Sequence, residues 1–181
     1  MIKRIPEYFG EYKGKAQATV ANFPKKLHRQ ERDWTCSIAC LRTILSGVMD
    51  EVPDENYFID TFKMAPGPYY SKDIKNREMI TGCESLFSCD LESKDITIDM
   101  IGDLLQRGYY VMVESMYNYA HWYVIMGYCA VENETNLEKH KLLIYDPYYN
   151  EVRLLNVDEF SGMWCDADNH VKEFIAVRQN R

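Results

Sequence analysis

The chain has 181 residues, of which 46 % are hydrophobic and 27 % are charged. This length and balance are typical of a soluble globular domain that buries a core of its own. The 21 basic residues are outnumbered by 28 acidic ones, which gives a formal net charge of −7. That charge argues against a non-specific nucleic-acid binder and against a polybasic membrane contact, because both need a basic surface.

Membrane insertion and secretion are also disfavoured by the sequence. No apolar run approaches the roughly 18 residues of a membrane span, and the first ten residues lack the apolar core of a signal peptide. The six cysteines, at positions 36, 40, 83, 89, 129 and 165, are therefore expected to be reduced thiols in a cytoplasmic protein. The close pairs 36/40 and 83/89 lack the C-x-x-C spacing typical of zinc sites, so neither a metal nor another cofactor is expected.

The first half of the chain has the pattern of helices. Apolar residues recur at helical spacing from Cys36 to Val48, which predicts a buried helix with Thr35 as its N-cap and Gly47 at its end. Further helices are predicted over 54–64, 72–81 and 97–107, the middle one weakly. The region 50–95 shows no clear strand pattern.

After Gly108 the apolar residues alternate instead. Strands are predicted over 109–115, 121–130, 141–145, 151–155 and 171–178, with a short helix over 156–164 and a long hairpin loop over 132–140. Short connections between strands are typical of an antiparallel sheet, and helices followed by strands indicate an α+β fold. We expect a single domain, 1–181, with an N-terminal extension (1–30), a helical lobe (31–107) and an antiparallel sheet lobe (108–181).

Four residues in a particular order suggest chemistry. Cys36 is expected at the first turn of a helix, whose dipole favours a thiolate. His121 opens a predicted strand and could accept the thiol proton, while Asp146 ends the next strand and could orient the imidazole. Gln30, six residues before Cys36, could donate an amide N–H to a developing oxyanion.

Each of these residues also has a purely structural interpretation. Cys36 could be a small core residue, His121 a satisfied structural histidine, and Asp146 part of an Asp-Pro turn. The combined order favours the catalytic interpretation. Cys40, one turn after Cys36, is interpreted as core, and the histidines outside this set are expected to be solvated or in turns; they are His28, His140 and His170.

The segment 30–41, which reads Gln-x5-Cys-x2-Ala-Cys-Leu, resembles the signature of the double-glycine-leader, bacteriocin-processing peptidases. The His-x-x-Val…Gly segment at 121–127 and the apolar-Asp-Pro segment at 142–147 resemble the same family's later motifs. The chain is similar, more distantly, to the small guanylyl-cyclase-domain family. The resemblance spans roughly 28–178, least well over 50–95, and implies a papain-like fold with an active cleft between a helical lobe and an antiparallel sheet.

The resemblance implies that Cys36 is the nucleophile, His121 the base, Asp146 the orienting acid and Gln30 the oxyanion donor of a cysteine peptidase or amide hydrolase. A peptide or protein would be its substrate, and its oligomeric state is left open. The family's Gly after the nucleophile is Ser37 here, which is expected to narrow the cleft. The family's exporters add membrane and ATPase domains that this sequence lacks, so a free-standing enzyme is expected and its substrate is not assumed to be a double-glycine leader.

Three other functions use the same residues differently. An amine that replaces water would make the protein an acyltransferase or ligase. Loss of catalysis would leave a peptide-binding module. Nucleotide chemistry, by analogy with the guanylyl-cyclase-domain family, has no Gly-rich phosphate loop or metal carboxylate pair to support it.

Overall fold

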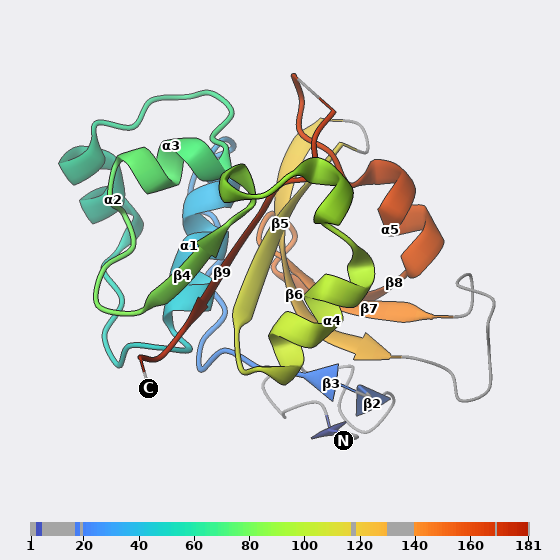
Figure 1. The fold of residues 1–181 in the computed structure, drawn as a ribbon. Coiled ribbons are helices and arrows are strands. Elements are labelled where there is room, and N and C mark those ends of the chain that lie inside the picture. The colour runs from blue at the N-terminus through green and yellow to red at the C-terminus, as the bar shows by residue number, and fades with distance from the viewer. Residues whose placement is uncertain are drawn as a thin grey trace.

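A computed structural model describes residues 3–4, 17–18, 20–116, 119–129, 140–168 and 170–180. Among these residues seven strands form one antiparallel sheet (Figure 1), in the order β4-β9-β5-β6-β7-β8 with β3 paired to the far end of β6. Its strands are β3 (Val20–Ala21), β4 (Glu84–Phe87), β5 (Tyr110–Met116), β6 (Ala120–Cys129), β7 (Lys141–Asp146), β8 (Glu151–Asn156) and β9 (Phe174–Arg178). A separate two-stranded pair joins β1 (Lys3–Arg4) to β2 (Gln17–Ala18).

Helices cover both faces of this sheet. They are α1 (Cys36–Leu45), α2 (Glu55–Phe62), α3 (Ser71–Asn76), α4 (Ile98–Gln106) and α5 (Val157–Met163), with short 3-10 turns at Ser88–Asp90 and Ser93–Asp95. One face packs on α1, and α2 and α3 lie beyond it, whereas α4 and α5 cover the other face (Figure 1). Alternation along the strands separates the two cores: Met112 and Trp122 face α1, while Val111 and Tyr123 face α4 and α5.

Helix α1 is the centre of the first core. Residues 37–45 are all buried, because α2 packs on the side that the sheet leaves uncovered. At its end Gly47 lies against the ring of Tyr110 on β5, and a Cβ there would come within 2.2 Å of that ring. Glycine at this position therefore lets the helix approach the sheet closely, which holds the first turn of α1 in place over the sheet.

The predicted antiparallel α+β architecture is confirmed, as are the predicted helices, although each is shorter than its pattern. Side-chain caps fix where two of these helices begin. Asp54 accepts from the Tyr57 N–H at the start of α2, and Thr97 accepts from the Met100 N–H at the start of α4. The hairpin loop predicted over 132–140 falls on residues outside the described ones, apart from its last residue.

Two strands of the seven-stranded sheet were not predicted, nor was the separate pair β1 and β2. The expectation that 50–95 holds no strand is wrong, because β4 forms the sheet edge beside β9. Leu86 on this edge strand is 37 % exposed, so its pattern lacks the alternation of a half-buried strand. Strand β3 has two residues, too few to show a period, and it draws the end of the expected N-terminal extension into the sheet.

Candidate active site

Cys36 is the first residue of α1, and its side chain is partly exposed. Thr35 occupies the N-cap position, as predicted, but its side chain makes no capping hydrogen bond to the helix. Its hydroxyl instead accepts from the Arg32 N–H and donates to the Arg32 carbonyl. The first backbone N–H groups of α1 thus have no side-chain cap, and the positive end of the helix dipole lies at the Cys36 thiol.

His121 and Asp146 meet on the neighbouring strands β6 and β7. The imidazole Nε2 lies 2.9 Å from the Asp146 Oδ1, and both side chains are at least 95 % buried. Asp146 also accepts from the Tyr148 N–H at 3.0 Å and from the Arg153 guanidinium at 3.1 Å. Three donors therefore hold this carboxylate. Cys36 lines the same cleft as His121 and lies close enough to raise the pKa of the imidazole.

The electrostatics of the pair favour an imidazolium. Burial lowers the pKa of His121, but the hydrogen bonds and charges of Asp146 and Cys36 outweigh burial and raise this pKa to about 9. Burial raises the pKa of Asp146, yet the hydrogen bond and charge of His121, with smaller contributions from Tyr148 and Arg153, lower it overall. At neutral pH the site therefore holds an ionised Asp146 next to a protonated His121.

Gln30 lies beside this site and is held by two hydrogen bonds, one from its backbone and one from its side chain. Its backbone N–H donates to the Pro147 carbonyl at 3.1 Å, directly after Asp146. Its side-chain Nε2 donates to the Arg32 carbonyl at 2.9 Å, while its Oε1 is buried without a partner. Gln30 lines a cavity adjacent to the Cys36 cleft, and Asp33 and Tyr148 line both.

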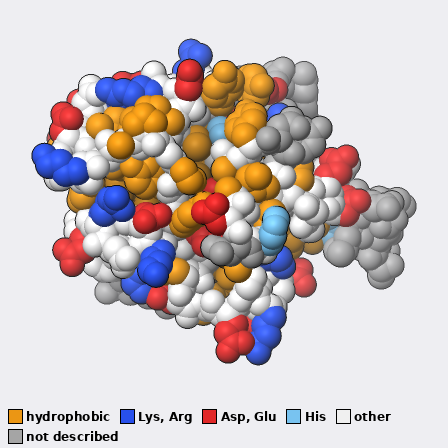
Figure 2. Space-filling view, turned by 90° about the horizontal axis from the view of Figure 1, so that it is seen from above, with side chains coloured by type: hydrophobic (Ala, Val, Ile, Leu, Met, Phe, Trp, Pro, Cys, Tyr) orange, Lys and Arg blue, Asp and Glu red, His pale blue; other side chains and the backbone are white. Residues whose placement is uncertain are grey.

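A cleft of about 400 Å³ opens over Cys36 and His121. Ser37, at the position where the peptidases that the sequence resembles have Gly, is buried and lines it. The region 50–95 contributes the wall formed by Gly67, Pro68 and Tyr69, which Trp122 fixes by donating its indole N–H to the Tyr69 carbonyl at 2.9 Å. Figure 2 views this end of the molecule and shows hydrophobic side chains gathered around a hollow in which a histidine is visible.

The secondary residues of the sequence analysis have mixed outcomes. Cys40 is fully buried, as expected, with its thiol donating to the Trp122 carbonyl at 3.2 Å, and burial raises its pKa. The expectation that His28 is solvated is wrong: it is 7 % exposed, and burial, together with the charges of Arg42 and Lys26, lowers its pKa to about 4. His140 is half-buried and lies 2.6 Å from the Tyr128 hydroxyl, so it too is not freely solvated.

Two residues at the site escaped the sequence analysis. Arg153 on β8 pairs with Asp146 from the next strand, and Glu114 on β5 lines the cleft beside its strand partner Trp122. A glutamate inside the apolar run of 110–116 is an unusual feature that could have marked Glu114. Arg153 had no comparable signal, because an arginine in an alternating strand is ordinarily solvated.

No protein-family profile matches the sequence, and no curated protein matches it either. Solved structures do resemble it. The peptidase domain of Streptococcus ComA, a bifunctional ABC transporter involved in a quorum-sensing pathway, has a TM-score of 0.56 at 18 % identity, covering 86 % of this chain and 98 % of that one. UfSP from C. elegans has a TM-score of 0.52 at 20 % identity, covering 97 % of this chain and 36 % of that one.

The chain therefore has a papain-like cysteine peptidase fold, as the sequence resemblance implied. Within the described part of the chain, no cluster of three or more His, Cys, Asp or Glu side chains is arranged to hold a metal ion. No helix in the same residues has the length and apolar character needed to cross a bilayer.

Proposed function

We propose that the protein is a cysteine peptidase or amide hydrolase that works through a thioester acyl-enzyme. The observation that carries the proposal is the 2.9 Å contact between His121 and Asp146, on a histidine that lines one cleft with a cysteine at a helix N-terminus. A thiolate paired with an imidazolium is the form in which a cysteine attacks a carbonyl.

In the proposed reaction the Cys36 sulfur forms a bond to the scissile carbonyl carbon. His121 then gives its proton to the leaving nitrogen as the C–N bond breaks, which leaves a thioester on Cys36. A water molecule, deprotonated by His121, attacks this thioester and releases the acid and the thiol. Asp146, held by three donors, keeps the imidazole in one orientation throughout both halves of the reaction.

The negative oxygen of each tetrahedral intermediate needs hydrogen-bond donors. The uncapped backbone N–H groups at the start of α1 are suited to this role. We assign the second donor to Gln30, which has two side-chain N–H bonds and uses one on the Arg32 carbonyl. Either the remaining N–H or the amide after rotation of the side chain would donate to the oxyanion. The buried Oε1 has no partner, so rotation would break no hydrogen bond at that atom.

The proposal is tested with a peptide library prepared from a digested proteome. The wild-type chain is expected to generate new peptide termini, detected by mass spectrometry, and Cys36→Ala is expected to generate none. Cleavage that persists in Cys36→Ala would overturn the assignment of the nucleophile. If the wild type cleaves no peptide but some peptides bind to it and are depleted from the library, the peptide-binding module would be favoured.

Acyl transfer is distinguished in the same experiment by adding a simple amine such as glycinamide. A hydrolase is expected to release free carboxylates, whereas a transferase would convert most of them into amides of the added amine. Hydrolysis is the form we propose, because the partly exposed Cys36 lies in an open cleft to which water has access.

A further inference from the structure

Glu114 is a buried carboxyl group that the proposed reaction does not use. It lies on β5 opposite Trp122 on β6, so its side chain is on the α1 face of the sheet and lines the cleft over Cys36. The side chain is 1 % exposed, and its Oε2 has no hydrogen-bond partner. A buried carboxyl oxygen without a partner is costly, and such an atom at the edge of a cleft indicates a ligand group that completes it.

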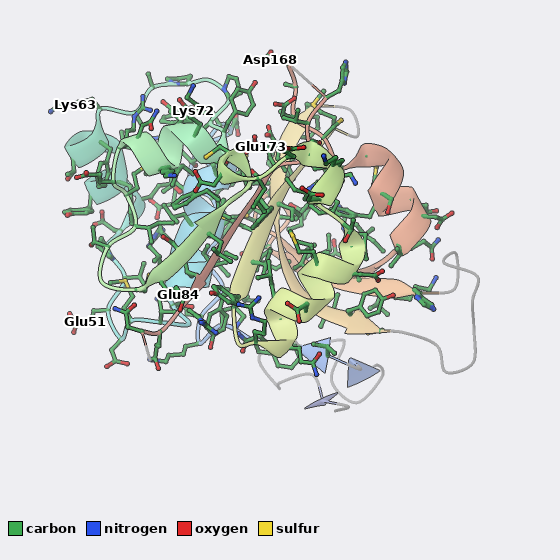
Figure 3. All side chains as sticks on the ribbon, in the orientation of Figure 1. Glu51, Lys63, Lys72, Glu84, Asp168 and Glu173 are labelled. Carbon is green, nitrogen blue, oxygen red and sulfur yellow. The ribbon has the colours of Figure 1, made fainter. Side chains whose placement is uncertain are left out.

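The groups around Glu114 carry negative charge. Burial, followed by the charges of Glu173, Asp166, Cys36 and Asp168, raises the pKa of Glu114 to about 9. Figure 3 shows Glu173 and Asp168 at the same end of the sheet. Glu173 is itself buried and accepts from the Ser71 N–H and the Ser88 hydroxyl, which hold its carboxylate in place. Glu114 is therefore surrounded by carboxyl groups, although Glu173 and Asp166 themselves line a neighbouring cavity.

The described residues supply no cation that neutralises Glu114, since none of the ion pairs found among them includes it. Lys72 lines a neighbouring cavity with Glu173 rather than the cleft. Arg77 pairs with Asp73, and Lys172 donates to the Ile96 carbonyl over the Trp164 ring. Among the described residues that line the cleft, the one positive group is the His121 imidazolium, which Asp146 and Cys36 already balance.

The remaining wall is apolar and suits the stem of a long basic side chain. Trp122 and Tyr69 line the cleft with Pro68, and their surfaces can pack against methylene groups or lie under an ammonium or guanidinium group. We propose that this end of the cleft, formed by Glu114 with Trp122 and Tyr69, binds a lysine or arginine side chain of the substrate. The inference rests on the proposed function, because it places that side chain next to the bond that Cys36 attacks.

Binding of the cation changes the protonation of Glu114. In the empty cleft the carboxyl group is neutral, and an entering ammonium or guanidinium group favours its ionised form. The carboxyl proton is released to solvent, and the resulting carboxylate pairs with the cation. The buried oxygen that lacks a partner in the empty cleft thereby gains a charged donor.

The test measures the rate at which Cys36 is modified by aminoalkyl methanethiosulfonates with two to six carbons. Each is compared with the uncharged alkyl reagent of the same length. In every case the Cys36 sulfur attacks the reagent's divalent sulfur, forms a disulfide and releases methanesulfinate. The ratio of the charged to the uncharged rate cancels the reactivity of the thiol itself and reports the attraction of the cleft for a cation. Mass spectrometry of the Cys36 peptide separates it from the other five thiols.

We expect a ratio of about 10 or more at one chain length in the wild type, because the reagent's cation pairs with the carboxylate that Glu114 forms when the cation enters. Glu114→Gln keeps the shape and hydrogen-bonding capacity of the neutral side chain but cannot ionise, so the ratio is expected to fall about fivefold or more. Glu51→Gln, at the opposite end of the molecule (Figure 3), removes an exposed carboxylate and is expected to leave the ratio unchanged.

A wild-type ratio near one at every chain length, or an unchanged ratio in Glu114→Gln, would overturn the inference. The rate with the uncharged reagents shows whether Glu114→Gln has kept the site intact. Asp168→Asn removes an exposed carboxylate near Glu114 and is expected to lower the ratio by less than Glu114→Gln does. Failure of the proposed function has a different signature: the peptide library would remain uncleaved, while the ratio would still report the cation preference.

Discussion

The imidazole of His121 and the carboxylate of Asp146 are joined by a 2.9 Å contact, although 25 residues separate them in the chain. Antiparallel pairing of β6 with β7 creates this contact, because the start of one strand lies beside the end of the next. The second carboxylate oxygen is held by Arg153 from β8. The orientation of the imidazole is thus determined by three consecutive strands of one sheet, which is a rigid support for the proton transfer proposed for His121.

Cys36 is expected to be the first of the six thiols to react with a limiting amount of iodoacetamide near pH 6. It is the cysteine that combines partial exposure, a helix N-terminus and a place beside His121 in the cleft. Burial raises the pKa of Cys40, Cys83 and Cys165, which makes them poorer nucleophiles. Mass spectrometry of the alkylated peptides gives the order. Modification of the exposed Cys89 ahead of Cys36 would count against the site, and His121→Ala should remove the preference.

Asp146→Asn is expected to lower kcat by less than the about 10⁴-fold found for the equivalent change in a serine triad. A preformed thiolate–imidazolium pair needs less support from the acid than a neutral serine–histidine pair does. Cleavage of a peptide identified in the library would measure the effect, with His121→Ala as the variant that should abolish turnover. Full activity of Asp146→Asn would mean that Asp146 is only the turn residue before Pro147.

Arg153→Met is expected to act on catalysis through Asp146. The substitution keeps a long apolar stem against Tyr123 but removes one of the three donors to the carboxylate, so kcat should fall by about tenfold with KM nearly unchanged. The pH above which His121 loses its proton should also decrease, since Asp146 would be held less firmly. Arg153→Lys should recover part of the activity. An unchanged pH profile in Arg153→Met would reduce Arg153 to a surface ion pair.

Gln30→Ala is expected to lower kcat by about 10²–10³ while KM changes little, because an oxyanion donor binds the tetrahedral intermediate more strongly than the substrate. Alkylation of Cys36 forms no oxyanion, so its rate should stay close to that of the wild type. Arg29→Ala, at the exposed neighbouring position, is the matched control. Equal losses of turnover and alkylation in Gln30→Ala would indicate a displaced 30–35 segment instead of a missing donor.

Glu114→Gln is expected to change how stability depends on pH. In the folded chain the pKa of Glu114 is raised from 4.5 to about 9, so between these values the unfolded chain releases a proton that the folded chain keeps. Stability therefore falls as pH rises through this window, by about 1.4 kcal/mol per pH unit for one such proton. Glu114→Gln should remove that contribution. Urea unfolding at pH 6, 7 and 8 checks the difference in slope between variant and wild type.

The raised pKa of His121 also makes stability fall as pH rises, and it is present in both Glu114→Gln and the wild type. Its contribution is fully present below the unfolded value of 6.5 and is lost as pH rises through about 9. Because it cancels in the difference, parallel slopes for Glu114→Gln and the wild type would show that Glu114 is already ionised in the folded chain.

The sequence by itself determined the order of the elements and the candidates for the chemistry. Periods of 3.6 and 2 residues are local properties, so α1, α4 and strands β5–β9 were predictable from side-chain spacing. Cys36, His121 and Asp146 could be selected because each has a recognisable position at the start or end of such an element. Strand β4 could not be found in this way, because an edge strand is defined by the strand it pairs with, here β9 at the far end of the sequence.

Only the tertiary structure determined which side chains are buried and which charged groups interact. Arg153 has an unremarkable local pattern, and the contacts of both Arg153 and Glu114 depend on which strand lies beside them and which face of the sheet is buried. The same holds for His28, which lies in a polar segment yet is buried against α1 through the bond from its N–H to Thr43. Burial and electrostatic coupling depend on distances between segments that are remote in the chain, and a linear pattern contains no such distances.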